Sequence, residues 1–174
     1  AFQSCISLQS VILSDTITEI PDGAFLSCSA LQEVTFGDAV TKIGRMAFAY
    51  CNTLASIEIP DTVTELGEQT FMGCSALESV TMPEGITALP AYIFQNCSSL
   101  KTFSIPDTLT DLGYLAFVGC SGLEELELSD NHPVYSLQDG VLYSKDLTVL
   151  YLYPAGRTET AFTVPDGVTT IYDG

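Results

Sequence analysis

The sequence has little positive charge. Only 5 of its 174 residues are Lys or Arg, against 22 Asp and Glu, which gives a formal net charge of −17. A protein that binds nucleic acid needs Lys and Arg side chains to displace counterions from phosphates, and docking on an anionic membrane needs the same residues. The charge balance therefore argues against nucleic acid and against an anionic lipid surface as partners.

Several chemical signatures are also missing. No apolar run reaches the roughly 18 residues that would span a bilayer, and no signal peptide is visible. The sequence has no CxxC, no H-E-x-x-H and no glycine-rich phosphate loop. The one histidine, His132, precedes a proline in a predicted loop, where we expect it to be exposed to solvent. We therefore expect no catalytic residue, no metal site and no cofactor, and we predict that the segment is not an enzyme.

What the sequence does contain is a repeat of 23 residues. Such a short unit with seven apolar positions cannot bury them alone, but stacked copies can. Three columns of apolar residues keep the 23-residue spacing without exception: Cys5, Cys28, Cys51, Cys74, Cys97 and Cys120; Phe2, Phe25, Phe48, Phe71, Phe94 and Phe117; Leu8, Leu31, Leu54, Leu77, Leu100 and Leu123.

Each repeat also carries the alternation of a strand. The pattern L-x-x-V-x-I places apolar residues inward and the residues between them outward. One such strand per coil, always in the same direction, predicts a parallel sheet that ends at Pro60, Pro83 and Pro106. A shorter β-like segment such as "DTVTEL" follows, and "GEQTFMGC" is expected to bring Phe and Cys inward through a short helical turn.

The repeat resembles the BspA-like leucine-rich repeat of bacterial surface proteins. The segments "LASIEIPDTVTELGEQTFMGC" (54–74) and "LKTFSIPDTLTDLGYLAFVGC" (100–120) match its pattern almost position for position. The resemblance implies a mainly β, right-handed leucine-rich-repeat solenoid. One face would carry a parallel sheet, and the other short turns, helical segments and short strands. We expect the regular repeats to cover residues 1–128.

The period breaks once. Ser129 and Pro165 are 36 residues apart where 23 are expected. Within the insert, "GVLY" and "TVLYLY" flank "SKDL", which predicts an inserted β-hairpin. We expect an irregular unit over 129–160 and the start of a further, truncated repeat over 161–174. Both ends fall at one phase of the repeat, so we expect the natural protein to continue on both sides.

The cysteines are expected to be free, buried thiols. Equivalent residues on neighbouring coils lie about 4.8 Å apart with parallel side chains, a geometry that suits a disulfide poorly. In this interpretation the thiols act as small apolar spacers, and they would suit an anaerobic or mildly reducing habitat.

The acidic turns offer an alternative site. Asp61, Glu84, Asp107 and Asp166 each follow a proline, and stacked carboxylates could hold Ca²⁺. The simpler interpretation is a solvated turn, since Pro-Asp is ordinary turn chemistry.

Two surfaces are candidates for binding a partner. The first is the outward face of the predicted sheet, which is polar and increasingly acidic: Gln32, Glu33, Thr35, Ser56, Glu58, Glu78, Ser79, Thr81, Lys101, Thr102, Ser104, Glu124, Glu125 and Glu127. The second is an aromatic patch on the insert, made of Tyr135, Tyr143, Tyr151, Tyr153 and Arg157, residue types that are enriched in binding hot spots. The alternative is that these tyrosines pack the insert onto the solenoid.

Together these observations predict a recognition or adhesion segment at the bacterial cell surface. The resemblance implies host, matrix or microbial protein partners, and the charge favours basic ones. A monomer is expected, with end-to-end association as a hazard of exposed sheet edges. The alternative function is a passive spacer that presents another module of a larger surface protein.

Overall fold

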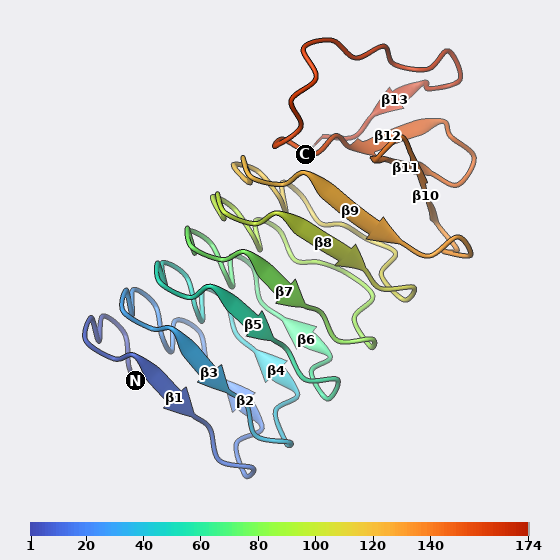
Figure 1. Ribbon diagram of the computed structural model, residues 1–174. Helices are drawn as coiled ribbons and strands as arrows, with labels where there is room; N and C mark the ends of the chain where they lie inside the picture. Colours follow the sequence, from blue (N-terminus) through green and yellow to red (C-terminus); the bar gives the residue numbers. More distant parts are fainter. Residues whose placement is uncertain (174) are drawn as a thin grey trace.

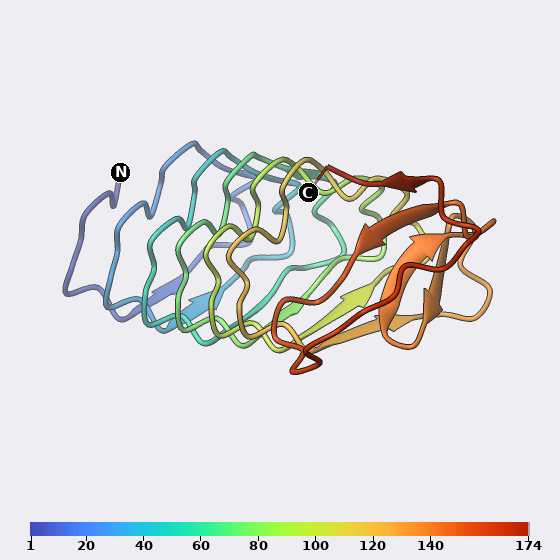
Figure 2. The ribbon, with the colours of Figure 1, turned by 90° about the horizontal axis from the view of Figure 1, so that it is seen from above.

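The computed structural model describes residues 1–173 as an elongated stack of coils that follow one another from the N-terminus to the C-terminus (Figures 1 and 2). Strands of two to four residues are the regular elements of this part of the chain. They are β1 (Ser10–Ile12), β2 (Glu19–Ile20), β3 (Glu33–Thr35), β4 (Lys42–Ile43), β5 (Ser56–Glu58), β6 (Glu65–Leu66), β7 (Ser79–Thr81), β8 (Thr102–Ile105), β9 (Glu125–Leu128), β10 (Tyr135–Gln138), β11 (Val141–Ser144), β12 (Val149–Leu152) and β13 (Thr170–Ile171).

The longer strands of the regular coils run in parallel along one face, as the alternation predicted (Figure 1). Their register equals the repeat, so that Ser10 pairs with Glu33, Ser56 with Ser79 and Thr102 with Glu125. Equivalent positions of successive coils therefore form straight rows across this face, which we call the front sheet.

The shorter strands form a second parallel sheet on the opposite side of the coils. β2, β4 and β6 pair in that order, with Ile20, Ile43 and Leu66 in one row. An isolated bridge between Ala88 and Asp111 continues the neighbouring row of Glu19, Lys42 and Glu65 into the next coils. The prediction of short strands opposite the front sheet is confirmed.

The core between the two sheets is built from the predicted columns. Successive phenylalanines from Phe2 to Phe117 stack with ring centroids 5.1–5.8 Å apart and interplanar angles of 4–24°. Offset stacking of this kind is a favourable aromatic geometry. The leucine column from Leu31 to Leu123 is buried as well, so one hydrophobic spine runs through the regular coils.

The cysteines do more than fill space. All six are free thiols; Cys5 is exposed and the other five are buried. Each buried Sγ donates a hydrogen bond of 3.0–3.4 Å to the carbonyl oxygen of the phenylalanine 26 residues earlier, as Cys74 does to Phe48. The thiol column thus ties each coil to the one before it.

The turn that carries Phe and Cys is not helical. Residues 68–73 form consecutive turns, and no helix occurs within residues 1–173. The prediction of a helical turn was wrong because two positions per coil adopt the left-handed conformation. One is the residue before cysteine, as at Tyr50 (φ 60°), and the other lies two residues before phenylalanine, as at Met46 (φ 54°) and Tyr92 (φ 59°). A left-handed residue interrupts a right-handed helix.

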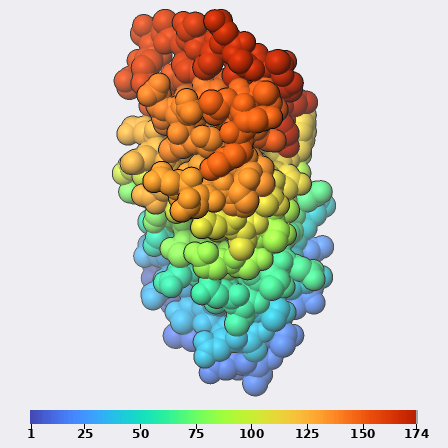
Figure 3. All heavy atoms as spheres, turned by 90° about the vertical axis from the view of Figure 1, so that its right-hand side faces the viewer, coloured from blue at the N-terminus to red at the C-terminus, as the bar shows by residue number. Residues whose placement is uncertain are grey.

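The irregular unit lies at one end of the molecule (Figure 3) and forms a small sheet of its own (Figures 1 and 2). β10 pairs antiparallel with β11, and β11 pairs antiparallel with β12, as the "SKDL" hairpin predicted. β13 then pairs in parallel with β12. Asp139 (φ 49°) and Gly140 (φ 74°) form the turn between β10 and β11, since both adopt the positive φ of a tight hairpin turn.

His132 joins the irregular unit to the regular coils and corrects a prediction. It is fully buried rather than exposed. Its Nδ1 accepts hydrogen bonds from the backbone N–H groups of Val134 (3.2 Å) and Tyr135 (3.0 Å). Because Nδ1 accepts, Nε2 carries the proton and donates to Pro106 O at 3.2 Å. The imidazole therefore satisfies three backbone groups where the regular period ends.

Candidate interaction surface

The outward rows of the front sheet are the first candidate surface. The predicted residues lie on or beside β3, β5, β7, β8 and β9, and all of them are exposed except Thr102, which is half-buried. The alternation is visible within single strands: Ser56 and Glu58 are exposed, whereas Ile57 between them is buried. The fold thus presents these side chains to solvent as one continuous face.

Negative charge on this face is concentrated in its last coil. The row that begins at Ser10 contains Glu33, Ser56, Ser79 and Thr102 before it reaches Glu125. Beside it lie Glu124, directly before β9, and Glu127 on β9, both exposed. The one cation of the face, Lys101, is paired with Glu78 at 2.9 Å. The predicted glutamates of β9 are therefore the most acidic part of the front sheet.

The other cations are also held by neighbouring groups. Lys42 lies 3.2 Å from Glu19 and 4.0 Å from Glu65, and Arg157 lies 2.6 Å from Glu159. Arg45 donates to Gln69 Oε1 at 3.0 Å. The ion pairs of Lys42 and Arg157 contribute little to stability, but they neutralise two of the few positive charges. Arg45 keeps its charge, because its partner is a neutral amide. The surface that remains is strongly anionic.

The predicted aromatic patch on the insert is largely internal. Tyr135 and Tyr143 are buried, at 1% and 3% exposure, so they cannot belong to an exposed patch. The Tyr135 hydroxyl donates to Thr110 O at 2.9 Å, which fixes β10 against a regular coil. Burial raises the pKa of Tyr135, so this hydroxyl keeps its proton. Tyr135 thus packs on the core of the solenoid, whereas Tyr143 is buried with Val141 and Leu150 in a separate cluster within the insert.

The rest of the patch is half-buried and organised around Arg157. Its guanidinium lies 5.1 Å from the Tyr153 ring centroid and donates to Asp139 O in the β10–β11 turn. Its hydrogen bond lowers the pKa of Glu159 to about 2. Tyr151 packs edge-on against Tyr135, with centroids 5.1 Å apart. These contacts stiffen the insert and leave little of it free for a partner.

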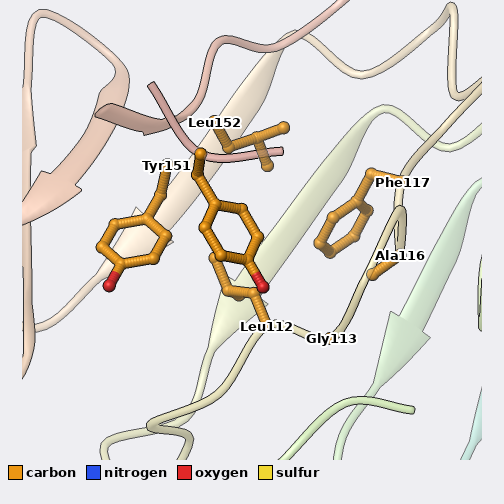
Figure 4. A pocket seen from close by; sticks show the side chains of 7 residues that line it. Leu112, Gly113, Ala116, Phe117, Tyr151 and Leu152 are labelled. Carbon is orange, nitrogen blue, oxygen red and sulfur yellow. The ribbon is translucent and has the colours of Figure 1, made fainter. Parts of the chain in front are cut away.

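A small apolar cavity lies where the last regular coil meets the insert (Figure 4). Leu112, Ala116 and Phe117 come from the coil, whereas Tyr151, Leu152 and Tyr172 come from the insert and the returning repeat. Its volume is about 10 Å³, which is the space of a single water molecule. The cavity is therefore a packing boundary rather than a ligand pocket.

One exposed aromatic pair was missed by the sequence analysis. Tyr92 and Tyr114 meet edge-to-face on neighbouring turns, with centroids 5.5 Å apart, and Tyr114 is 46% exposed. The two residues occupy different positions of their repeats, so no column pointed to them.

Carboxylates in the acidic turns accept hydrogen bonds from backbone N–H groups. Asp61 accepts a hydrogen bond from Glu84 N at 3.2 Å, one coil further on, and Asp22 does the same for Arg45 N at 2.7 Å. Within residues 1–173 no group of three or more His, Cys, Asp or Glu side chains is placed to hold a metal ion. The contacts of these carboxylates thus explain them as turn residues.

Comparison with known proteins places this geometry in a family. A model of the BspA type leucine rich repeat region, in six copies, matches residues 1–124 and 41–153. The chain belongs to the BspA type leucine-rich repeat family. The stack of coils described above is thus a leucine-rich-repeat solenoid, as the resemblance implied.

Solved structures agree with the family. A leucine rich cell surface protein from Faecalibacterium prausnitzii A2-165 is 31% identical, with a TM-score of 0.74 over 92% of this chain and 50% of that one. A leucine-rich repeat protein from Eubacterium ventriosum ATCC 27560 is 27% identical, with a TM-score of 0.73 over 95% of this chain and 50% of that one. The pneumococcal vaccine antigen PcpA shares the fold at 21% identity, with a TM-score of 0.79 over 94% of this chain and 41% of that one.

The chain spans half or less of the length of these three structures. A comparison with curated proteins found no match. Within residues 1–173 there is no helix with the length and apolar character that a membrane span requires.

Proposed function

We propose that this segment is a cell-surface recognition module whose front sheet binds basic extracellular proteins, without catalysis. The observation that carries the proposal is the exposed, aligned set of polar and acidic rows that ends in Glu124, Glu125 and Glu127. Such a surface attracts cationic partners and loses affinity as salt screens it. The likeness to a protein described as a cell surface protein supports the location.

The experiment that tests this function is binding to a panel of extracellular matrix and mucosal proteins at physiological salt. The decisive variant is Glu124→Lys/Glu125→Lys/Glu127→Lys on the front sheet. A matched control, Asp15→Lys/Asp38→Lys/Glu68→Lys, makes the same change of charge on exposed positions outside the strands of the front sheet and keeps the ion pairs of Lys42. We expect saturable binding that the front variant loses and the control keeps.

Other outcomes favour other functions. Binding that both variants keep would direct attention to the insert or to the Tyr92–Tyr114 pair. A folded protein that binds no member of the panel would contradict the proposal and favour the spacer. The spacer interpretation also has structural support, because the continuous phenylalanine stack and the thiol–carbonyl bonds make the solenoid a stiff rod.

A further inference from the structure

The front sheet is paired two strands at a time. β1 pairs with β3, β5 with β7, and β8 with β9, whereas no ladder joins β3 to β5 or β7 to β8. On the front sheet, one backbone hydrogen bond, from Lys101 N to Glu78 O at 3.3 Å, joins the coils of β7 and β8, which are hydrogen-bonded to each other elsewhere around the coil. The face is thus divided into two-coil blocks with boundaries between them.

Each block boundary holds a hollow on the front sheet. The first hollow, about 310 Å³, lies between β3 and β5 above Phe36, and the second, about 290 Å³, lies between β7 and β8 above Met82. A third, about 90 Å³, lies beside Leu128 where β9 meets β10. Phe36, Met82 and Leu128 occupy the same position of the repeat, at intervals of two repeats. The hollows therefore recur every second coil.

The hollows combine an apolar floor with negative charge at the rim. Glu58 lines the first hollow, and Glu84 and Glu127 line the second. The third contains a cation of the protein itself: Lys145 lines it and donates from Nζ to Asp130 O at 3.2 Å. A lysine side chain of the protein thus lies at the edge of the smallest hollow, beside Leu128.

The distance between the hollows can be compared with the side-chain repeat of an extended polypeptide partner. Hydrogen-bonded strands lie about 4.8 Å apart, so two coils correspond to a distance of at least about 9.6 Å. A polyproline II chain repeats its side-chain direction every three residues at about 3.1 Å per residue, or about 9.3 Å. A β-strand repeats its side-chain direction after two residues, at about 6.7 Å, and so matches less well.

We propose that the front sheet binds an extended cationic polypeptide in the polyproline II conformation, with Lys or Arg at every third residue. Each basic side chain lays its apolar stem on Phe36 or Met82, and its charge meets Glu58 in the first hollow or Glu84 and Glu127 in the second. Long basic side chains commonly bury their stems in this manner while the charge stays solvated. This inference rests on the proposed function and names the chemistry of its partner.

The test compares synthetic peptides of equal length and charge in a proline background. Five lysines are placed at every second, every third or every fourth residue, and affinity is measured by isothermal titration calorimetry at physiological salt. We expect the peptide with lysine at every third residue to bind at least tenfold more tightly than the other two. Equal affinities would overturn the spacing argument while leaving the charge-based function intact.

Variants locate the binding on the hollows. Glu58→Gln/Glu127→Gln should remove the preference for the three-residue spacing, whereas the control Glu65→Gln/Glu68→Gln, away from the front sheet, should keep it. Lys145→Gln removes the positive charge beside the third hollow. It should raise the affinity of a peptide whose lysines reach all three hollows. If Glu58→Gln/Glu127→Gln keeps the preference, the inference is wrong. If no peptide binds while the panel of matrix proteins does, the inference fails and the proposed function stands.

Discussion

The regular coils and the irregular unit are stabilised in different ways. In the coils, the same residue recurs at each level, and every Phe, Leu and Cys packs on its own equivalent one repeat away. In residues 129–160 the contacts are unique: His132 bonds Pro106, Tyr135 bonds Thr110, and Arg157 bonds the β10–β11 turn. Repetition stabilises the first region, whereas the second is stabilised by contacts that occur only once, both these polar anchors and the apolar packing of Tyr135 and Leu142 on the core.

This difference predicts which part of the molecule each substitution should destabilise. A repeat contacts only its neighbours, so the loss of one column residue should weaken two coil interfaces. The loss of one polar anchor should instead release the insert and leave the coils folded. The three predictions below test this contrast in order of expected size.

The largest effect is expected from Phe71→Ala. Phe71 is fully buried between Phe48 and Phe94, and removing a buried phenylalanine ring typically costs about 3–5 kcal/mol. Urea unfolding followed by circular dichroism measures this loss. Phe2→Ala is the control, because Phe2 is 43% exposed on the first coil and should cost much less. Similar losses for both would contradict a stability that depends on stacked neighbours.

A smaller and more local effect is expected from His132→Ala. The substitution leaves Val134 N, Tyr135 N and Pro106 O without their partner, and an unsatisfied buried group costs about 1–3 kcal/mol. Hydrogen exchange should accelerate within 129–145 and stay unchanged around Phe71. His132→Asn, which keeps a short acceptor, should recover part of the protection. Uniform acceleration along the whole chain would show that the insert is not an independent unit.

The smallest loss of stability, counted per pH unit, is expected at alkaline pH, and it should come from the thiols of the regular coils. Burial raises the pKa of the Cys120 thiol to about 12, so the folded chain keeps the proton that the unfolded chain loses above its ordinary value of 9.0. The stability from this thiol is complete below pH 9 and falls by about 1.4 kcal/mol per pH unit above it.

Urea titrations at pH 8, 9 and 10 measure this slope. The pKa values of Cys51, Cys74 and Cys97 are raised by burial as well, so the wild-type slope should be a sum over several thiols. Cys120→Ala should reduce the slope even though it also lowers stability at pH 8. A slope that this variant leaves unchanged would assign the alkaline transition to other groups.

The parts of the fold that follow the period could be predicted from the sequence. The columns of Phe71 and Cys74 place a residue inward at every level, because stacked coils repeat one environment. The outward rows follow from the same reasoning, since strand residues alternate between two sides. Exposure of Glu58 and burial of Ile57 are therefore read directly from their positions.

The features that the sequence did not predict lie at positions that do not recur from one repeat to the next. His132 has no equivalent in other repeats, so nothing in the pattern showed that its two ring nitrogens would satisfy three backbone groups. β10 was missed because "YSLQ" alone is a weak strand signal, and it forms only by pairing with β11. The left-handed turns escaped because Met46, Tyr92 and Leu115 occupy one column with no shared chemistry. The hollows depend on how strands pair, which side-chain patterns do not encode.

The buried thiol column determines how the protein responds to oxidants. Thiolates rather than thiols react with oxidants, and access to the sulfur limits the rate. The buried thiols keep their protons and oxidants cannot reach them, so both factors slow their oxidation. The free cysteines therefore do not require the reducing habitat that the sequence analysis associated with them. Exposed Cys5 is the exception. Oxidation of Cys51, Cys74 or Cys97 must wait for its own coil to open, so the extent of oxidation at each position would record how often that coil opens.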